Sequence, residues 1–343
     1  MGKYNIAVVG VGAVGVELLC CLRQRRFPIE NLRVFARSKR DIEVERVIYH
    51  VEALQGAALD NIDIALFAGT EGEKGASRTY AQKFIEEGAA VIDNGADFRL
   101  EEDVPLIVPE ANREKIFTHK GLIANPNCTT IQMIVALSGI YKKFGLRKII
   151  LTSFQAISGA GKKAAMTLWE ETKEITAQNR GKEYDTLDKK IKKEFAVFQD
   201  QVLFNVIPQI GSFGEDDYTS EEWKVVDETH KIFNNPDIEI SATCARVPVF
   251  TSHSEAIYFQ TGRDADLGGV KETLKNSEGV ILYEDRTYPL PLDVEGTDLV
   301  YVARIRRDPS VKNSFWIWVV ADNLRKGAAL NAVQIAELLK DNL

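Results

Sequence analysis

A strand, a glycine-rich turn and a helix open the chain, and this pattern limits the fold more than any other stretch does. The apolar run Tyr4–Val9 leads directly into the turn Gly10–Gly15, and leucines at helical spacing follow. Glycines let such a turn bend tightly and approach a pyrophosphate, which then rests on the helix N-terminus. The sequence therefore predicts a doubly wound parallel sheet that binds a dinucleotide. The residues expected at the cofactor are Gly10, Gly12, Ala13, Val14 and Gly15.

The second predicted strand ends in a basic stretch, which favours one of the two nicotinamide dinucleotides. The strand covers residues 32–36 and is followed by Arg37, Ser38 and two further basic residues. An acidic residue here would bind the ribose hydroxyls of NAD, whereas cations suit the 2′-phosphate of NADP. A solvated basic loop is the alternative interpretation. We predict that Arg37 and Ser38 contribute to a preference for NADP over NAD.

Further apolar runs alternate with a helical pattern through the first third of the chain. Strands are predicted at residues 62–67, 90–92 and 122–124, and a helix between residues 75 and 87. This alternation predicts an α/β domain of the Rossmann type. The polar loop 93–99 follows the carboxyl end of a strand, where ligands of such sheets bind. Arg99, in this loop, is either an ordinary surface arginine or a bidentate ligand for an anion.

A lone cysteine lies where a turn becomes a helix. Asn127 belongs to a turn, and apolar residues at three- and four-residue spacing follow Cys128 as far as Gly145. Cys128 would then lie in the first helical turn, where free N–H groups and the helix dipole favour a thiolate and could hold an oxyanion. A small buried residue beside a turn is the alternative, and position alone does not decide between them.

The second half of the chain departs from the nucleotide-binding pattern. Strands are predicted at residues 147–154, 240–246, 254–261, 299–306 and 315–321. They indicate an α+β domain with a mostly antiparallel sheet. Such a sheet needs its exposed face covered, which favours a symmetric homodimer. The final helix, from about Arg325, is expected to pack back on the first domain.

Several polar residues of this second half are candidates by position, although each has a simpler interpretation. Glu221 and Lys224 lie three residues apart on a predicted helix and share a face, so they could merely pair with each other. Arg246 ends a strand, and His253 follows seven residues later. A single histidine is often only a satisfied polar residue, and a cysteine partner would be needed to make it a catalytic candidate.

Length and charge limit the classes of protein to which the chain can belong. With 343 residues and 45% hydrophobic content, the chain is too long for one ordinary core, so two domains are expected. We place the dinucleotide-binding domain at residues 1–127, completed by residues 322–343, and the catalytic and dimerisation domain at residues 128–321. The net charge of -7 is spread along the chain, which argues against nucleic acid or an anionic membrane as a partner.

Cysteine usage and hydropathy give an expected compartment. The four cysteines include no CxxC pair and have no metal-type spacing with the four histidines, so no metal is expected and a reducing compartment is indicated. No apolar run is long enough to span a bilayer, and the N-terminus enters a strand without a signal-type segment. The expected location is the cytoplasm.

Several motifs, taken in order, resemble those of the aspartate-semialdehyde dehydrogenase family. They lie at residues 126–132 (PNCTTIQ), 155–161 (QAISGAG), 208–210 (PQI), 246–249 (RVPV), 252–255 (SHSE) and 322–328 (DNLRKGA). The resemblance covers essentially the whole chain, and the combination is far more specific than any single motif. It implies a reversible, NADP-dependent reductive dephosphorylation of 4-aspartyl phosphate to aspartate 4-semialdehyde, a step toward lysine, threonine and methionine.

The resemblance also implies a role for each matching residue near the cysteine. It makes Cys128 the nucleophile, which forms a thioester, and His253 the acid/base catalyst. It makes Gln155 a residue that orients the reacting groups, with Asn127 beside the nucleophile. This would settle the choice left open above in favour of a reactive cysteine.

The same resemblance implies a binding residue for each charged group of the substrate. It assigns the α-carboxylate to Arg246, the ammonium group to Glu221, and the phosphate to Arg99 with Lys224. A zwitterion that also carries phosphate needs one anionic and one extra cationic group, so the shared helix face of Glu221 and Lys224 becomes useful. The residues placed on the cofactor side are Ser158, Gly159 and Asn323.

Two other functions compete with this one. An N-acetyl-glutamyl-phosphate reductase shares the cysteine mechanism, but Glu221 argues against it because a blocked amine carries no positive charge to pair. A non-catalytic paralogue would keep the fold as a dimeric interaction module. Such a protein should have lost its nucleophile, whereas Cys128 and His253 are both present.

Overall fold

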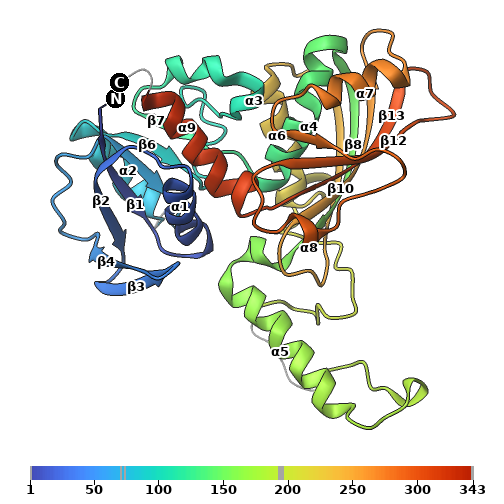
Figure 1. Ribbon diagram of the computed structural model, residues 1–343, viewed down its shortest axis with the longest axis horizontal. Coiled ribbons are helices and arrows are strands. Elements are labelled where there is room, and N and C mark those ends of the chain that lie inside the picture. Colours follow the sequence, from blue (N-terminus) through green and yellow to red (C-terminus); the bar gives the residue numbers. More distant parts are fainter. Residues whose placement is uncertain (1, 70–71, 73–74, 192–196, 341–343) are drawn as a thin grey trace.

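The computed structural model describes residues 2–69, 72, 75–191 and 197–340, and it has two parts, each built around a β-sheet (Figure 1). The chain builds the first sheet, passes through a helix into the second, and returns at its C-terminal end to the first. The predicted fold class, a Rossmann-type domain joined to an α+β domain, is confirmed.

Within the described residues, seven strands form the first sheet in the order β3-β4-β2-β1-β5-β6-β7. Only β3 and β4 pair antiparallel; the other neighbours are parallel. The strands are β1 (Tyr4–Val9), β2 (Ile29–Ala36), β3 (Arg40–Val44), β4 (Val47–Ala53), β5 (Ile64–Phe67), β6 (Ala90–Asp93) and β7 (Leu122–Ala124).

Alternate residues of β1 enter two different cores, which is why helices cover both faces of this sheet. Ile6 and Val8 pack with α1 (Ala13–Gln24) and α9 (Leu330–Lys340). Ala7 and Val9 pack with α2 (Ala76–Glu86). The Tyr4 hydroxyl donates to the carbonyl oxygen of Lys340 at 2.7 Å, which fastens the end of α9 to β1.

The return of α9 agrees with the expectation for the last helix, although residues 341–343 lie outside the described residues. The proposed boundaries at residues 127/128 and 321/322 stay a prediction.

The hairpin of β3 and β4 was not predicted. The sequence analysis interpreted residues 37–40 as a basic stretch after the second strand and predicted no strand there, whereas Arg40 is the first residue of β3. Three of the five residues of this edge strand are charged, and charged edge strands resist unwanted pairing but look like loops in a sequence.

Within the described residues, six strands form the second sheet in the order β11-β12-β13-β10-β8-β9. The three central pairings, β12 with β13, β13 with β10 and β10 with β8, are antiparallel. The strands are β8 (Leu146–Gln155), β9 (Glu239–Arg246), β10 (His253–Thr261), β11 (Val280–Leu282), β12 (Val300–Arg307) and β13 (Ser314–Ala321).

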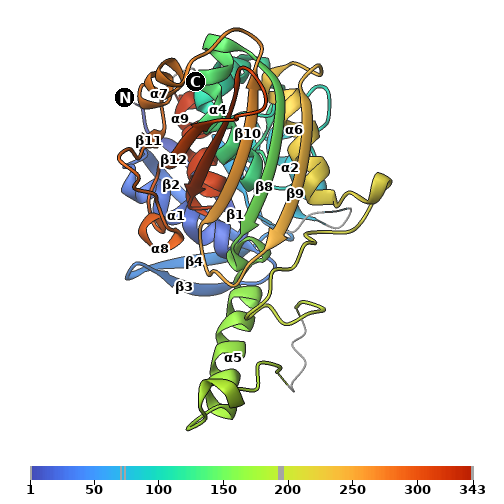
Figure 2. The same ribbon diagram turned by 90° about the vertical axis from the view of Figure 1, so that its right-hand side faces the viewer.

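Helices α4 (Cys128–Phe144), α6 (Ser220–Phe233) and α7 (Leu267–Lys275) cover one face of this sheet and bury its apolar residues. Half-buried aromatic side chains lie on the opposite face, where the rings of Phe154 and Trp318 are 5.7 Å apart. Figure 2 shows β8, β9 and β10 side by side. The shorter helices are α3 (Pro109–Asn112) and α8 (Pro291–Val294).

Helix α5 (Lys162–Gln178) projects away from both sheets in Figures 1 and 2. Residues 170–194 are dense in Lys, Glu and Asp with few large apolar residues, a composition that predicts a solvated helix and loop. Helix α5 extends into that range; residues 192–196 lie outside the described part. In the part of the chain that the structure describes, no helix is long and apolar enough to cross a membrane.

Candidate active site

Two neighbouring cavities hold most of the residues that the sequence singled out. The first, of about 360 Å³, is lined by Cys128 and by residues from both parts of the molecule. The second, of about 940 Å³, lies along the glycine turn and shares Gly12 with the first. The predicted residues around the first cavity are Gly12, Ala13, Val14, Arg99, Asn127, Cys128, Gln155, Ser158, Gly159, Glu221, Lys224, Arg246 and Asn323.

Cys128 is the first residue of α4, as predicted, and Asn127 caps that helix. The Asn127 side-chain oxygen accepts hydrogen bonds from the backbone N–H groups of Thr129 at 2.9 Å and Thr130 at 3.3 Å. A cap of this kind occupies N–H groups that a helix start leaves without partners. It therefore fixes both the start of α4 and the position of the sulfur on the cavity wall.

His253 is the first residue of β10 and faces the cysteine. Its Nε2 lies 3.4 Å from the Cys128 sulfur, although the two residues are 125 positions apart in sequence. Its Nδ1 accepts a hydrogen bond from the backbone N–H of Ala156 at 3.0 Å. The cysteine partner that would make this histidine a catalytic candidate is thus present.

The surroundings of Cys128 act against the thiolate that the helix start favours. Burial raises the pKa of the Cys128 thiol to about 12, and the nearby charge of Glu221 acts in the same direction. Arg99 and Arg246 lower the pKa, but by less than burial raises it. The surroundings of Cys128 in the free site therefore favour the protonated thiol.

Glu221 and Lys224 pair with each other and also face the cavity, so the structure agrees with both interpretations of their three-residue spacing. Both line the cavity, and Lys224 Nζ lies 3.6 Å from a Glu221 carboxylate oxygen. Glu221 also accepts hydrogen bonds from the side-chain amides of Asn127 at 2.9 Å and Gln155 at 3.2 Å. The amides thus hold Glu221 in a fixed position beside the nucleophile.

Arg246 is buried at the end of β9, where its Nη1 donates to the carbonyl oxygen of Ala156 at 2.7 Å. Its guanidinium stays charged, since burial lowers its pKa only from a very high starting value. A β-carbon added to Gly159 would lie 3.4 Å from both Arg246 and His253. Gly159 therefore leaves the approach to both side chains open.

Glu228 is a site residue that the sequence analysis missed. Its buried carboxylate accepts hydrogen bonds from Arg99 Nη1 at 2.9 Å and from the backbone N–H of Asn127 at 2.6 Å. It therefore ties an anion-binding candidate to the turn before the nucleophile. Glu228 lies seven residues after Glu221, on the same face of α6, and this spacing was the signal that could have found it.

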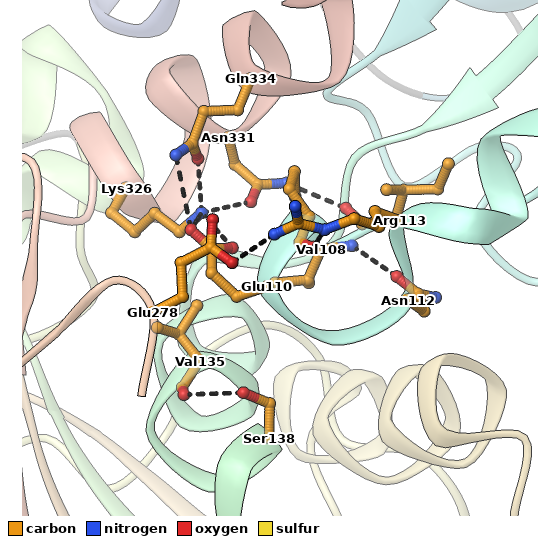
Figure 3. Close-up of polar contacts among 12 residues, drawn as sticks. Val108, Glu110, Asn112, Arg113, Val135, Ser138, Glu278, Lys326, Asn331 and Gln334 are labelled. Atoms are coloured by element: carbon orange, nitrogen blue, oxygen red, sulfur yellow. Dashed lines mark hydrogen bonds and ion pairs between the residues drawn. The ribbon is translucent and has the colours of Figure 1, made fainter. Parts of the chain in front are cut away.

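A buried ion pair between Lys326 and Glu110 was also missed (Figure 3). Lys326 is 1% exposed, and its Nζ donates to both carboxylate oxygens of Glu110 at 2.8 Å. It also donates to Asn331 at 2.9 Å and Gln334 at 2.6 Å. Asn331 in turn donates to the side chain of Asn125 at 2.7 Å, in the turn that precedes Cys128.

This network fixes a π-helical turn, Arg325–Ala329, against the nucleophile. Wide turns of this kind are rare and occur often at functional sites. A β-carbon added to Gly327 would come within 3.0 Å of the Cys128 β-carbon. Lys326, the residue before this glycine, therefore holds one wall of the site in place. In the sequence it looks like a surface lysine, because its burial arises only in the folded chain.

The glycine turn has the shape that a pyrophosphate requires. Gly10 has φ of +104°, and a β-carbon there would lie 2.5 Å from the Ala68 carbonyl oxygen. A β-carbon on Gly15 would lie 1.9 Å from the Gly10 carbonyl oxygen, so the turn closes only with glycine at both positions. Gly12 precedes α1 without a side-chain cap, which leaves the first N–H groups of that helix available to an anion.

The basic residues beside the larger cavity only partly match the prediction. Arg37 lines it together with Arg40, and Lys163 reaches it from the start of α5. Ser38 lines neither cavity and accepts a hydrogen bond from Arg40 at 3.4 Å. Arg40 belongs to the basic stretch that the sequence analysis noted, whereas Lys163 was not singled out, because its closeness to the glycine turn arises only in the folded chain.

Asn323 lies where the two parts of the molecule meet the first cavity. Its oxygen accepts hydrogen bonds from the Ser158 hydroxyl and the Ser252 backbone N–H, both at 3.0 Å. Its buried Nδ2 has no partner among the described residues and is available to a ligand carbonyl. In the same residues, no group of histidine, cysteine and carboxylate side chains could hold a metal ion.

Comparisons with known proteins agree with this arrangement. Family models for the NAD binding domain and the dimerisation domain of semialdehyde dehydrogenases match residues 5–119 and 137–326. The sheets and the site between them therefore define an oxidoreductase of the semialdehyde dehydrogenase class, with a domain that binds a nicotinamide cofactor.

Relatives with similarity along the whole chain narrow this class. Aspartate-semialdehyde dehydrogenases from Aquifex aeolicus and Bacillus subtilis are 44% and 41% identical to the chain, over 98% and 99% of both proteins. Aspartate semialdehyde dehydrogenase II from Vibrio cholerae, in complex with ASA, has a TM-score of 0.92 at 39% identity, with 99% of each chain covered. The chain belongs to the aspartate-semialdehyde dehydrogenase family.

Proposed function

We propose that this chain catalyses the reversible, NADP-dependent reductive dephosphorylation of 4-aspartyl phosphate to aspartate 4-semialdehyde through a thioester on Cys128. The step leads toward lysine, threonine and methionine. The observation that carries the proposal is the 3.4 Å approach of Cys128 and His253 beside a cavity lined by three cationic side chains and one buried carboxylate.

The charges around the cavity match the charges of such a substrate. Arg246 suits the α-carboxylate, and Glu221 suits the ammonium group. Arg99 and Lys224 are left for the phosphate. Pairing the ammonium group with Glu221 would also weaken the effect by which this carboxylate raises the pKa of the thiol.

The chain's own residues account for the covalent part of the reaction. The Cys128 sulfur attacks the acyl carbon, a sulfur–carbon bond forms, and phosphate leaves with the electron pair of the broken carbon–oxygen bond. Gln155, through its bonds to Thr129 at 2.8 Å and Glu221, orients the groups around the sulfur. When bound, the nicotinamide supplies the hydride in one direction and accepts it in the other.

Cofactor binding is supported by the fit of several residues. The turn of Gly10, Gly12 and Gly15, with Ala13 and Val14 at the start of α1, suits the pyrophosphate. Ser158, Gly159 and the partnerless amide of Asn323 suit the nicotinamide end. Arg37 and Arg40 favour NADP; a structural relative from Candida albicans, determined with NADP, shares the fold at a TM-score of 0.72 and 22% identity.

Arg40→Ala is expected to raise the KM for NADP about 10–100-fold, because a charge-assisted bond to the 2′-phosphate is lost. The KM for NAD, which lacks that phosphate, should stay within about twofold of wild type. Lys39→Ala is the matched control, since Lys39 lies in the same stretch but does not line the cavity. Steady-state kinetics with both cofactors measure the effect, and equal or better efficiency of the wild type with NAD would refute the preference.

The wild type is expected to use aspartate semialdehyde about 100-fold or more better in kcat/KM than N-acetylglutamate semialdehyde, because an acylated amine carries no positive charge to pair with the buried Glu221 carboxylate. Glu221→Gln should lose most of this discrimination. Asp227→Asn, on the same helix but outside the main cavity, should keep it. Similar efficiency with both substrates would favour the N-acetyl-glutamyl-phosphate reductase alternative.

We further propose a homodimer through the open face of the second sheet. The half-buried Phe154 and Trp318 lie on that face, and the ring of Trp316, on the same strand, lies 5.4 Å from that of Tyr258. A second copy would cover these rings. All four cysteines lie in the described part and are free, which supports a reducing, cytoplasmic location.

A further inference from the structure

We propose that Lys163, in the first turn of α5, binds the pyrophosphate of the nicotinamide cofactor and supplies the cation that the glycine turn lacks. The inference deepens the proposed function and rests on it for the identity of the cofactor. Lys163 then contributes to the affinity for NADP and NAD alike, whereas Arg40 contributes to the choice between them. Since α5 follows β8 of the second sheet, the cofactor would contact both parts of the molecule.

The start of α5 lies beside the glycine turn. Gly161, the residue before this helix, lines the first cavity together with Gly12 and Ala13. Lys163, two residues later, lines the second cavity together with Gly10 and Gly12. Gly12 borders both cavities, so the glycine turn and the start of α5 pass together from one cavity to the other. A phosphate group at the turn would therefore lie between α1 and the first turn of α5.

The glycine turn offers hydrogen-bond donors to a pyrophosphate but no charged side chain. Residues 10–15 are glycine, alanine and valine, and the N–H groups at the start of α1 supply only a partial positive charge. Among the described residues that line the second cavity, the cations are Arg37, Arg40 and Lys163. Both arginines lie just after β2, where the 2′-phosphate is expected. Lys163 is left for the pyrophosphate, which a lysine ammonium binds as a point charge.

The charge of Lys163 is unfavourable for its own helix. The first turn of α5, which the structure describes in full, begins with Lys162 and Lys163 and contains no acidic residue. Cations at this end of a helix face the positive end of its dipole and destabilise it. Departures from local preference of this kind are expected at functional positions. Lys163 thus weakens the free helix but would be favourable beside an anionic ligand.

Lys163→Met is expected to raise the Kd of both NADP and NAD about 5–20-fold, because one charge-assisted contact to the pyrophosphate is lost. The ratio of the two constants should stay within about twofold of the wild-type ratio, since both cofactors contain the pyrophosphate. Fluorescence of bound NADPH, with NADP and NAD as competitors, measures both constants on the whole chain without turnover. Unchanged affinity for both cofactors would overturn the proposal. A loss confined to NADP would also overturn it, because Lys163 would then bind the 2′-phosphate.

Lys162→Met is the matched control, since Lys162 is an exposed neighbour that lines neither cavity. It should leave both Kd values within about twofold of wild type. Each substitution should leave the melting temperature of the free protein unchanged or raise it by up to about 2 °C, because an unfavourable charge is removed from the helix start. An equal loss of affinity in the two variants would show a general effect of charge and contradict a contact by Lys163.

Labelling of lysine amines locates the contact directly. Acetic anhydride acylates exposed amines, and tandem mass spectrometry of the digested chain distinguishes Lys162 from Lys163, both of which are exposed. Saturating NAD should slow the labelling of Lys163 about fivefold or more, because an ammonium group paired with phosphate is less often deprotonated. The rate at Lys162 should change by less than about twofold. The same rate at Lys163 with and without NAD would contradict the contact.

These measurements distinguish the inference from the proposed reaction, because binding and labelling need only the cofactor. If both match the expectation but the wild type does not turn over aspartate semialdehyde, the proposed function fails and Lys163 stands as a binding residue. If the wild type turns over this substrate but Lys163→Met binds both cofactors as tightly as wild type does, the reaction stands and the inference fails.

Discussion

Cys128→Ala is expected to abolish the phosphate-dependent oxidation of aspartate semialdehyde, with a fall in kcat of about 10⁴-fold or more. The sulfur is the atom that would carry the acyl group, and no other described side chain around this cavity is a thiol. Because Cys128 is half-buried at the helix start and not in a core, the variant should fold normally. The measurement is the initial rate of NADPH formation at saturating phosphate.

Cys20→Ala is the matched control for this experiment. Cys20 is a free, 8% exposed cysteine of α1 that lines neither cavity, and its replacement should change kcat by less than about twofold. Thermal unfolding of both variants checks that they are folded. Turnover by a folded Cys128→Ala variant at more than about a hundredth of the wild-type rate would refute the thioester mechanism. A folded wild type without turnover would support the non-catalytic alternative.

Lys326→Met is expected to lower the free energy of unfolding by about 3–5 kcal/mol, because it leaves the Glu110 carboxylate buried without a cation. Glu110 is 5% exposed and receives two of the hydrogen bonds that Lys326 donates. The hydrogen bonds by which Lys326 holds the turn at Gly327 in place are lost as well, so kcat should fall with little change in KM. Urea unfolding followed by tryptophan fluorescence, together with steady-state kinetics, measures both effects.

Two further variants test whether the buried pair itself is responsible. Glu110→Gln combined with Lys326→Met removes both charges and should recover part of the lost stability. Lys142→Met is the matched control, since Lys142 is exposed and donates only to the backbone oxygen of Glu110 at 2.8 Å. It should cost less than about 1 kcal/mol, as removal of an ordinary exposed hydrogen bond does. A similar cost for Lys142→Met and Lys326→Met would contradict the proposed anchor.

Local patterns in the sequence were sufficient for the elements that begin or end on distinctive residues. Strand β1, its glycine turn and the start of α4 at Cys128 were predicted at the positions where the structure has them. Glycine conformation, helix capping and apolar spacing act within a few residues, so a sequence records them directly. The family resemblance added candidates for the catalytic and substrate-binding residues; the fold brings all of them except His253 to the wall of one cavity, and His253 lies 3.4 Å from the Cys128 sulfur.

Charged edge strands and buried charges could not be predicted in the same way. Arg40 in β3 looked like part of a loop, while Lys326 and Glu228 looked like ordinary charged residues on helices. What distinguishes Lys326 and Glu228 is a buried partner far away in the chain; Lys326 and Glu110 are 216 residues apart, and Glu228 and Arg99 are 129 apart. Their burial and pairing are properties of the packed chain, and no local pattern encodes them.

The sequence by itself determined the nucleotide-binding turn, the helix start at the nucleophile and the order of the two sheets, because each depends on short-range backbone preferences. Only the tertiary structure decided the surroundings of Cys128 and of His253. Burial raises the pKa of the Cys128 thiol, and the backbone N–H of Ala156 contacts Nδ1 of His253, 97 residues away. Both effects arise from desolvation and from long-range contacts, and these exist only once the chain has folded.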